Sequence, residues 1–226
     1  MTKKTIIRQT CPQVKVCGLT IPKQALLCAR LGVDAIGLVF FEESPRNVTR
    51  EQASAICDAV GDSVAKIGVF VDASYNTIIS AINECGLSGV QLHGKETPAL
   101  VKRLVKNGIK VIKSLYINAE PNMNKAHRYG ASAYLLECAG GRLPGGNALS
   151  WNWETARAFS EKYPLVLAGG IKPENVVEAM QKTSPGAIDV SSGVEEMAGK
   201  KNLSRVSKLI HLVHRTKIDN GCRRIF

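Results

Sequence analysis

Eight short runs of apolar and β-branched residues recur along the chain, and each is followed by a stretch with helical periodicity. Strands that alternate with helices predict a parallel sheet, and eight such units predict closure into a (β/α)8, or TIM, barrel. An open doubly wound sheet is the alternative, but it usually carries its glycine-rich phosphate loop after the first strand. The expected strands cover residues 14–19, 35–40, 66–71, 89–93, 110–116, 133–138, 165–168 and 187–190.

The length of the chain suits one domain. Its 226 residues, 45% of them hydrophobic, are enough to build a single large core, and barrels of this kind commonly have this size. We therefore expect one domain over residues 1–226, with an N-terminal extension at 1–13. Residues 215–226 form a basic C-terminal tail, which we expect to be solvated.

The charge balance favours anionic partners in general. There are 30 Lys and Arg against 19 Asp and Glu, a formal net charge of +11. The positive charges are scattered and aromatic residues make up only 5%, so no nucleic-acid surface is expected. No signal peptide and no run long enough to span a membrane is evident. We expect a cytoplasmic monomer or homodimer that takes a small phosphorylated substrate.

Small residues follow the last two expected strands. Gly169 and Gly170 come after one strand, and Ser191, Ser192 and Gly193 come after the next. Exposed backbone N–H groups and helix N-termini at such turns bind phosphate without a metal. In a (β/α)8 barrel the loops after strands 7 and 8 are the usual place for this site. Two ordinary tight turns are the alternative, but their succession one repeat apart favours a phosphate site.

Ionisable side chains stand at the C-terminal ends of several strands, where barrel enzymes carry out their chemistry. Side chains alternate along a strand, so Lys15 and Cys17 share one face. A thiol becomes a useful base or nucleophile when neighbouring cations lower its pKa, as Lys15 could do. Glu137 offers a carboxyl group from another strand that could donate a proton, or it could form a salt bridge at the rim with Arg46 or Arg142.

Three further residues are candidates for substrate contacts. Arg46, in the long loop after the second strand, suits bidentate binding of a carboxylate. His93 is either a substrate contact or a structural histidine. Asp189 could accept hydrogen bonds from a sugar hydroxyl, or it could hold Lys15 or Lys113 inside the barrel.

No metal or cofactor is expected. The four histidines are dispersed, and the seven cysteines show neither the CxxC spacing of metal and redox sites nor a disulfide framework. Nucleotide-binding glycine motifs are also absent from the sequence.

Seven motifs stand at the ends of the expected strands or in the loops that follow them: KVCGLT (15–20), GLVFFEESPRNVT (37–49), VFVDAS (69–74), VQLHG (90–94), VLAGGIKPENV (166–176), DVSSGVE (189–195) and GKK (199–201). These motifs resemble the N-(5'-phosphoribosyl)anthranilate isomerase family of tryptophan biosynthesis, and the similarity runs from about residue 14 to about residue 212. The resemblance implies a (β/α)8 barrel that performs a cofactor-free Amadori rearrangement of an aminoaldose phosphate to an aminoketose phosphate.

The resemblance implies roles for individual residues. Cys17 matches the general base that removes the C2' proton of the ribose, and Glu137 matches the acid that protonates the ring oxygen. Arg46 matches the arginine that binds the anthranilate carboxylate, and Asp189 matches an aspartate near the ribose. The phosphate grip corresponds to Gly169, Gly170, Ser191 and Ser192.

Two features of the sequence depart from the family pattern. Glu137 stands where the family has aspartate, and residues 145–149 lack a glycine and a lysine of the family's strand-6 loop. Two other interpretations are therefore open, namely a related isomerase for a different aminoaldose phosphate and a non-catalytic phosphate-binding barrel.

Overall fold

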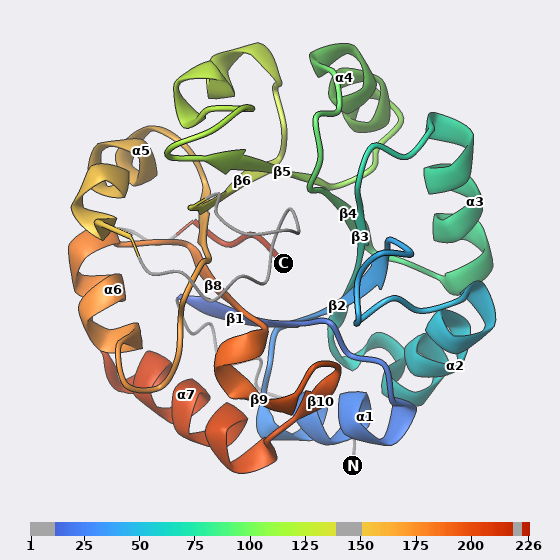
Figure 1. Ribbon diagram of the computed structural model, residues 1–226, viewed down its shortest axis with the longest axis horizontal. Coiled ribbons are helices and arrows are strands. Elements are labelled where there is room, and N and C mark those ends of the chain that lie inside the picture. The colour runs from blue at the N-terminus through green and yellow to red at the C-terminus, as the bar shows by residue number, and fades with distance from the viewer. Residues whose placement is uncertain (1–11, 139–150, 219–222) are drawn as a thin grey trace, which may run out of the picture.

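Eight parallel strands close into a barrel in the order of the sequence, which confirms the predicted fold (Figure 1). The computed structural model describes residues 12–138, 151–218 and 223–226. Each strand begins and ends within two residues of its expected bounds. The strands are β1 (Gln13–Cys17), β2 (Ala35–Phe40), β3 (Ala65–Phe70), β4 (Gly89–Leu92), β5 (Val111–Tyr116), β6 (Ala133–Glu137), β7 (Leu165–Leu167) and β8 (Ala187–Val190).

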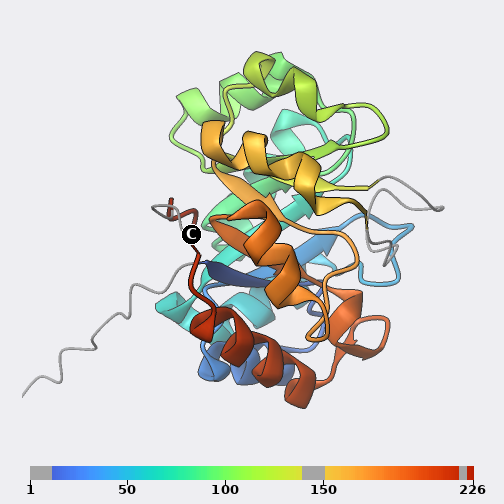
Figure 2. The ribbon, with the colours of Figure 1, turned by 90° about the vertical axis from the view of Figure 1, so that its left-hand side faces the viewer.

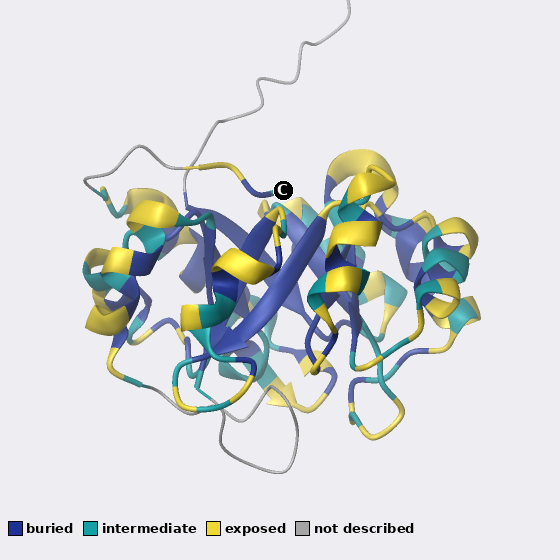
Figure 3. Cartoon of the chain, turned by 90° about the horizontal axis from the view of Figure 1, so that it is seen from above, coloured by how far each residue is buried: buried dark blue, intermediate teal, exposed yellow. Residues whose placement is uncertain are grey.

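Helices surround the barrel and bury their apolar faces against the strands (Figures 1 and 3). Thr49 caps α2 through a capping box, in which the Thr49 hydroxyl accepts from the Gln52 amide and the Gln52 side chain accepts from the Thr49 amide. No helix in the described part of the chain is long and apolar enough to cross a membrane. The α-helices are α1 (Pro22–Leu31), α2 (Arg50–Val60), α3 (Tyr75–Cys85), α4 (Pro98–Lys106), α5 (Arg157–Lys162), α6 (Val176–Thr183) and α7 (Leu203–Arg215).

The expectation of a full helix after every strand is wrong for β5. The segment that follows β5 forms a short 3-10 helix, η2 (Met123–Arg128). The Asn122 side chain accepts a hydrogen bond from the Asn124 amide, and Gly130 takes a positive φ soon after the helix ends. Asparagine side chains that bond to the local backbone favour short turns over α-helix, so the segment tightens instead of extending.

Three further 3-10 helices and a small hairpin complete the described elements. The 3-10 helices are η1 (Gly61–Ser63), η3 (Trp153–Ala156) and η4 (Ser192–Val194). The hairpin consists of β9 (Glu195–Met197) and β10 (Lys200–Lys201) and lies between β8 and α7. Two hydrogen bonds between Lys201 and Gln24 attach it to α1, close to β1 (Figure 1).

The end of the chain closes the barrel at the N-terminal ends of the strands. Ile225 is only 5% exposed and packs with the apolar side chains that fill the barrel interior. The Gln13 side chain accepts hydrogen bonds from the amides of Ile225 and Phe226, at 2.7 and 2.9 Å. Figure 2 shows this end of the chain on the opposite side of the barrel from the β9–β10 hairpin. The prediction of a solvated tail is therefore wrong at Ile225, although the side chains of Arg223 and Arg224 are exposed.

Candidate active site

Cys17 lies at the C-terminal end of β1 with its thiol inside the barrel. The facing residue on β2 is Gly37, where a Cβ atom would lie 2.6 Å from the sulfur, so only glycine leaves room for the thiol. Burial raises the pKa of Cys17 above its ordinary value, and the nearby cation of Lys15 offsets this only in part. Lys15 thus lowers the pKa of the thiol as expected, but burial outweighs it and the pKa stays above the ordinary value.

A buried ion pair links the first and last strands beneath the thiol. Lys15 Nζ donates to both carboxylate oxygens of Asp189, at 2.9 and 3.0 Å, and the lysine side chain is fully buried. Burial alone would lower the pKa of Lys15, but the interactions with Asp189 and Cys17 more than compensate and the pKa is raised. Of the partners proposed for Asp189, the structure selects Lys15, which keeps a charged lysine next to Cys17.

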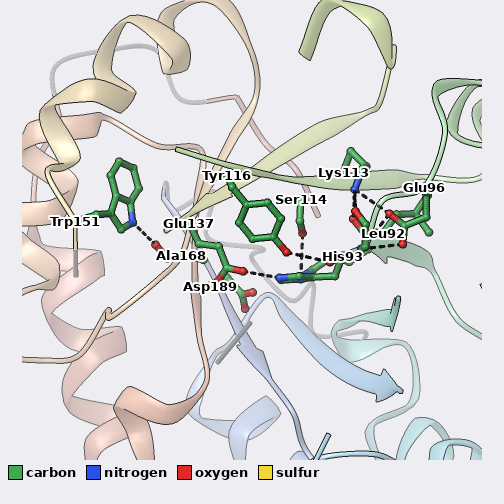
Figure 4. A network of polar contacts seen from close by, with 12 residues as sticks. Leu92, His93, Glu96, Lys113, Ser114, Tyr116, Glu137, Trp151, Ala168 and Asp189 are labelled. Atoms are coloured by element: carbon green, nitrogen blue, oxygen red, sulfur yellow. Dashed lines mark hydrogen bonds and ion pairs between the residues drawn. The ribbon is translucent and has the colours of Figure 1, made fainter. Parts of the chain in front are cut away.

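Glu137 and His93 form the second half of the site, from β6 and from the end of β4 (Figure 4). Glu137 Oε1 lies 2.6 Å from His93 Nε2, and both side chains are about 90% buried or more. Gln91 Nε2 approaches His93 Nδ1 at 2.7 Å, and Ser114 Oγ lies 3.1 Å from the same nitrogen. His93 is therefore held at both ring nitrogens, with Nε2 within hydrogen-bond distance of the Glu137 carboxyl group. The partner of Glu137 is thus His93 and not Arg46.

Behind His93 a buried salt bridge fixes the β4 loop. Lys113 Nζ lies 2.8 Å from Glu96 and also donates to the carbonyls of Leu92 and Gly94 (Figure 4). The phenol of Tyr116 donates to the His93 carbonyl at 3.1 Å, and burial raises the pKa of Tyr116. These contacts hold the backbone that carries His93.

Arg46 is buried and bound on one side, in contrast to a solvated loop arginine. Its Nε and Nη2 donate to the two oxygens of Glu195 on β9, at 2.9 and 2.6 Å. Lys201 on β10 reaches the same carboxylate. Burial would raise the pKa of Glu195, but hydrogen bonds and charges from Arg46 and Lys201 lower it, so the carboxylate stays ionised.

The loops after β7 and β8 lie against one another. Gly169 and Gly170 adopt positive φ values of 82° and 67°, which side chains disfavour. A Cβ on Gly193 would meet the Ile171 carbonyl at 1.9 Å, so the two loops touch at that point. The structure thus brings the predicted phosphate residues together, with Ser192 and Gly193 in η4.

Two contacts tie these loops to their surroundings. The Ser191 hydroxyl donates to the Cys17 carbonyl at 3.0 Å, so this side chain joins β8 to β1. The Trp151 indole donates to the Ala168 carbonyl, directly before Gly169 (Figure 4). The strand-6 loop positions 145–149, and Arg142, lie outside the described residues.

The comparisons with known proteins bear on this arrangement. The family model for N-(5'-phosphoribosyl)anthranilate (PRA) isomerase matches residues 14–212. The chain belongs to this family. A curated relative, the N-(5'-phosphoribosyl)anthranilate isomerase of Desulfatibacillum aliphaticivorans, is 47% identical over 214 residues, which are 95% of this chain and 98% of the relative. The relative from Gloeothece citriformis is 38% identical over 91% of this chain and 95% of its own length.

Solved structures agree with the family assignment. The phosphoribosyl anthranilate isomerase of Thermotoga maritima superposes with a TM-score of 0.82 at 33% identity and covers 89% of this chain and 98% of its own. A structure of a phosphoribosyl anthranilate isomerase in complex with reduced 1-(o-carboxyphenylamino)-1-deoxyribulose 5-phosphate superposes with a TM-score of 0.79, also at 33% identity, over 89% of this chain and 97% of its own. A third describes monomers generated from a dimeric form. The isomerase assignment implied by the motifs, with its place in tryptophan biosynthesis, is therefore confirmed.

The sequence predicts the side chains that face the site but not the residues that hold them in place. Glu195 and Lys201 belong to the DVSSGVE and GKK motifs, but nothing in those motifs predicts their contact with Arg46. Glu96 and Tyr116 carried no signal beyond being polar groups close to strand ends. Their partners lie on other strands, and only closure of the barrel brings them together.

Proposed function

We propose that this isomerase converts N-(5-phosphoribosyl)anthranilate to 1-(2-carboxyphenylamino)-1-deoxyribulose 5-phosphate, with Glu137 as general acid and Cys17 as general base. The observation that supports this assignment is that the Glu137 carboxyl group at the end of β6 and the Cys17 thiol at the end of β1 both face the barrel interior, each beside a polar partner. His93 holds Glu137 at 2.6 Å, and Lys15 accompanies Cys17.

The acid step opens the sugar. Glu137 gives a proton to the ring oxygen, the bond from this oxygen to C1' breaks, and the nitrogen lone pair forms the iminium. One carboxyl oxygen of Glu137 is held by His93 Nε2, so the other is the one we assign to the substrate. Proton transfer by a positioned side chain contributes about 10²- to 10⁴-fold to rate.

The base step moves a hydrogen. The Cys17 thiolate removes the C2' proton, and the electrons of that bond neutralise the iminium to give an enolamine. C1' then regains a proton while the C2' hydroxyl loses one to become the ketone, so acid and base return to their starting states. The cation of Lys15 favours the thiolate form of Cys17, because opposite charges stabilise each other.

The remaining predicted residues bind substrate in this proposal. The phosphate occupies the backbone cradle of the β7 and β8 loops, supported by the glycine conformations and loop contact there. Arg46 receives the anthranilate carboxylate, and Asp189 receives a ribose hydroxyl while it holds Lys15.

Loss of anthranilate fluorescence during turnover tests the assignment in the purified full-length chain. We expect Cys17→Ala and Glu137→Gln each to lower kcat about a hundredfold or more with little change in KM. Cys57→Ala is the matched control, because Cys57 is also a buried thiol but lies on α2. A Cys17→Ala variant with wild-type kcat would refute the role of the base.

The two open alternatives give different results in the same assay. A related isomerase would turn over another aminoaldose phosphate faster than phosphoribosylanthranilate. A non-catalytic barrel would bind the substrate analogue without any turnover by the wild-type chain.

A further inference from the structure

Glu195 is held between two cations at the mouth of the barrel. Its carboxylate accepts from Arg46 Nε and Nη2 and lies 2.5 Å from Lys201 Nζ. The Lys201 side chain is fully buried and that of Glu195 is 5% exposed, so the three groups form one water-poor cluster. No role follows for Glu195 from the acid and base steps.

The cluster leaves one edge of the Arg46 guanidinium available. A guanidinium has two edges that can bind a carboxylate with paired hydrogen bonds. Glu195 occupies the Nε and Nη2 edge, and within the described part of the chain Nη1 makes no hydrogen bond. A second carboxylate can therefore approach the edge formed by Nη1 and the remaining hydrogen of Nη2.

The charge of the cluster favours such a ligand. Two cations and one carboxylate leave one positive charge, which a second carboxylate would balance. A buried charge without a partner is unfavourable, so the site is electrostatically prepared for an anion.

The backbone places this edge near the reacting groups. The aliphatic part of the Arg46 side chain packs on Gly18, the residue that follows Cys17. The contact is close, since a Cβ atom added to Gly18 would lie 2.4 Å from Arg46 Cδ. Lys201 lies 3.4 Å from the hydroxyl of Ser191, and that hydroxyl donates to the Cys17 carbonyl. The β9–β10 hairpin thus sets the position of Arg46 relative to the proposed base.

We propose that Glu195 is a positioning residue that fixes Arg46 so that its second edge binds the carboxylate of the substrate's aromatic ring. This proposal rests on the proposed function, because it assumes a carboxylate-bearing arylamine. It separates two roles. Arg46 touches the substrate, whereas Glu195 acts only through Arg46 and affects binding of the carboxylate more than the chemical step.

Titration calorimetry with two ligands tests the proposal in the full chain. One ligand is reduced 1-(o-carboxyphenylamino)-1-deoxyribulose 5-phosphate, and the other is the same molecule without the carboxyl group. We expect Glu195→Gln to weaken binding of the first ligand about ten- to hundredfold and of the second less than about twofold. In turnover, KM should rise while kcat stays within about threefold of wild type.

Further variants keep the test interpretable. Glu196→Gln is the matched control, because Glu196 is the next residue on β9 and makes an exposed pair with Lys200. If Glu195→Gln does not fold, Glu195→Asp keeps the buried charge but shortens its reach to Arg46 by one methylene, and it should give the same discrimination between ligands. Equal weakening of both ligands, or none, in the folded variant would overturn the proposal.

The proposed function fails separately. It would be refuted by a wild-type chain that discriminates between the two ligands but does not turn over phosphoribosylanthranilate. Normal turnover by both the wild type and Glu195→Gln, with unchanged KM, would refute only the role of Glu195.

Discussion

The carboxyl group of Glu137 at the end of β6 lies 2.6 Å from the Nε2 atom of His93, which directly follows β4. The two strands are not neighbours, since β5 lies between them. His93 is in turn fixed by Gln91 and Ser114. The proposed acid is therefore held by a chain of side chains that crosses three strands.

Shortening the acid should separate it from His93. In Glu137→Asp the carboxyl group withdraws by one methylene, and a displacement of about 1 Å can cost about a hundredfold in rate. We expect kcat to fall about ten- to hundredfold with KM nearly unchanged, measured by anthranilate fluorescence. Wild-type kcat in this variant would show that the contact with His93 does not position the acid.

The rate should depend on pH through Cys17. Burial raises the pKa of this thiol, and a base is active only when deprotonated. On the limb governed by Cys17, kcat/KM should therefore increase with pH beyond the ordinary thiol pKa of about 8.5. Replacing Lys15 with Met removes the cation that partly offsets burial, so it should move this limb to higher pH. A limb complete below pH 7 would contradict the assignment.

The salt bridge behind His93 should matter for stability. In Glu96→Gln the fully buried Lys113 ammonium loses its counter-ion, which we expect to lower the free energy of unfolding by about 3–5 kcal/mol. Urea denaturation measures this loss. The double variant with Lys113→Met should recover part of it, because no unpaired charge is left.

The same variant should respond to pH with a defined sign. Burial lowers the pKa of Lys113 in the folded protein, and the loss of Glu96, which raises it, should lower it further. At pH values between the lowered pKa of Lys113 in the folded variant and its value of about 10.4 in the unfolded chain, the unfolded chain binds more protons than the folded one. The free energy of unfolding of the variant therefore rises with pH in this range. The deficit of Glu96→Gln should therefore be smaller at pH 10 than at pH 7, and a larger deficit at pH 10 would contradict this account.

The C-terminal residues should stabilise the barrel from its far end. Ile225→Ala removes an apolar side chain that packs among the interior residues, at an expected cost of about 2–4 kcal/mol in the free energy of unfolding. Arg224→Ala is the control, since that side chain is exposed. Both variants should keep wild-type kcat at 25 °C, because the active site lies at the other end of the strands. An unchanged urea midpoint for Ile225→Ala would show that the tail does not stabilise the fold.

The sequence by itself determined the architecture and the direction of the key side chains. Repeated strand and helix patterns predicted the closed barrel, and alternation along β1 predicted that Lys15 and Cys17 share a face. These features are local, because side-chain direction in a strand follows from backbone geometry alone.

Only the tertiary structure decided which charged groups pair. The sequence left Lys15 and Lys113 as possible partners of Asp189, and the structure shows that Asp189 pairs with Lys15. Arg46 binds Glu195, which is 149 positions further along the chain. The raised pKa of Cys17 likewise depends on how completely the barrel buries it. Pairing and burial are properties of groups brought together from distant strands, so no local sequence pattern can encode them.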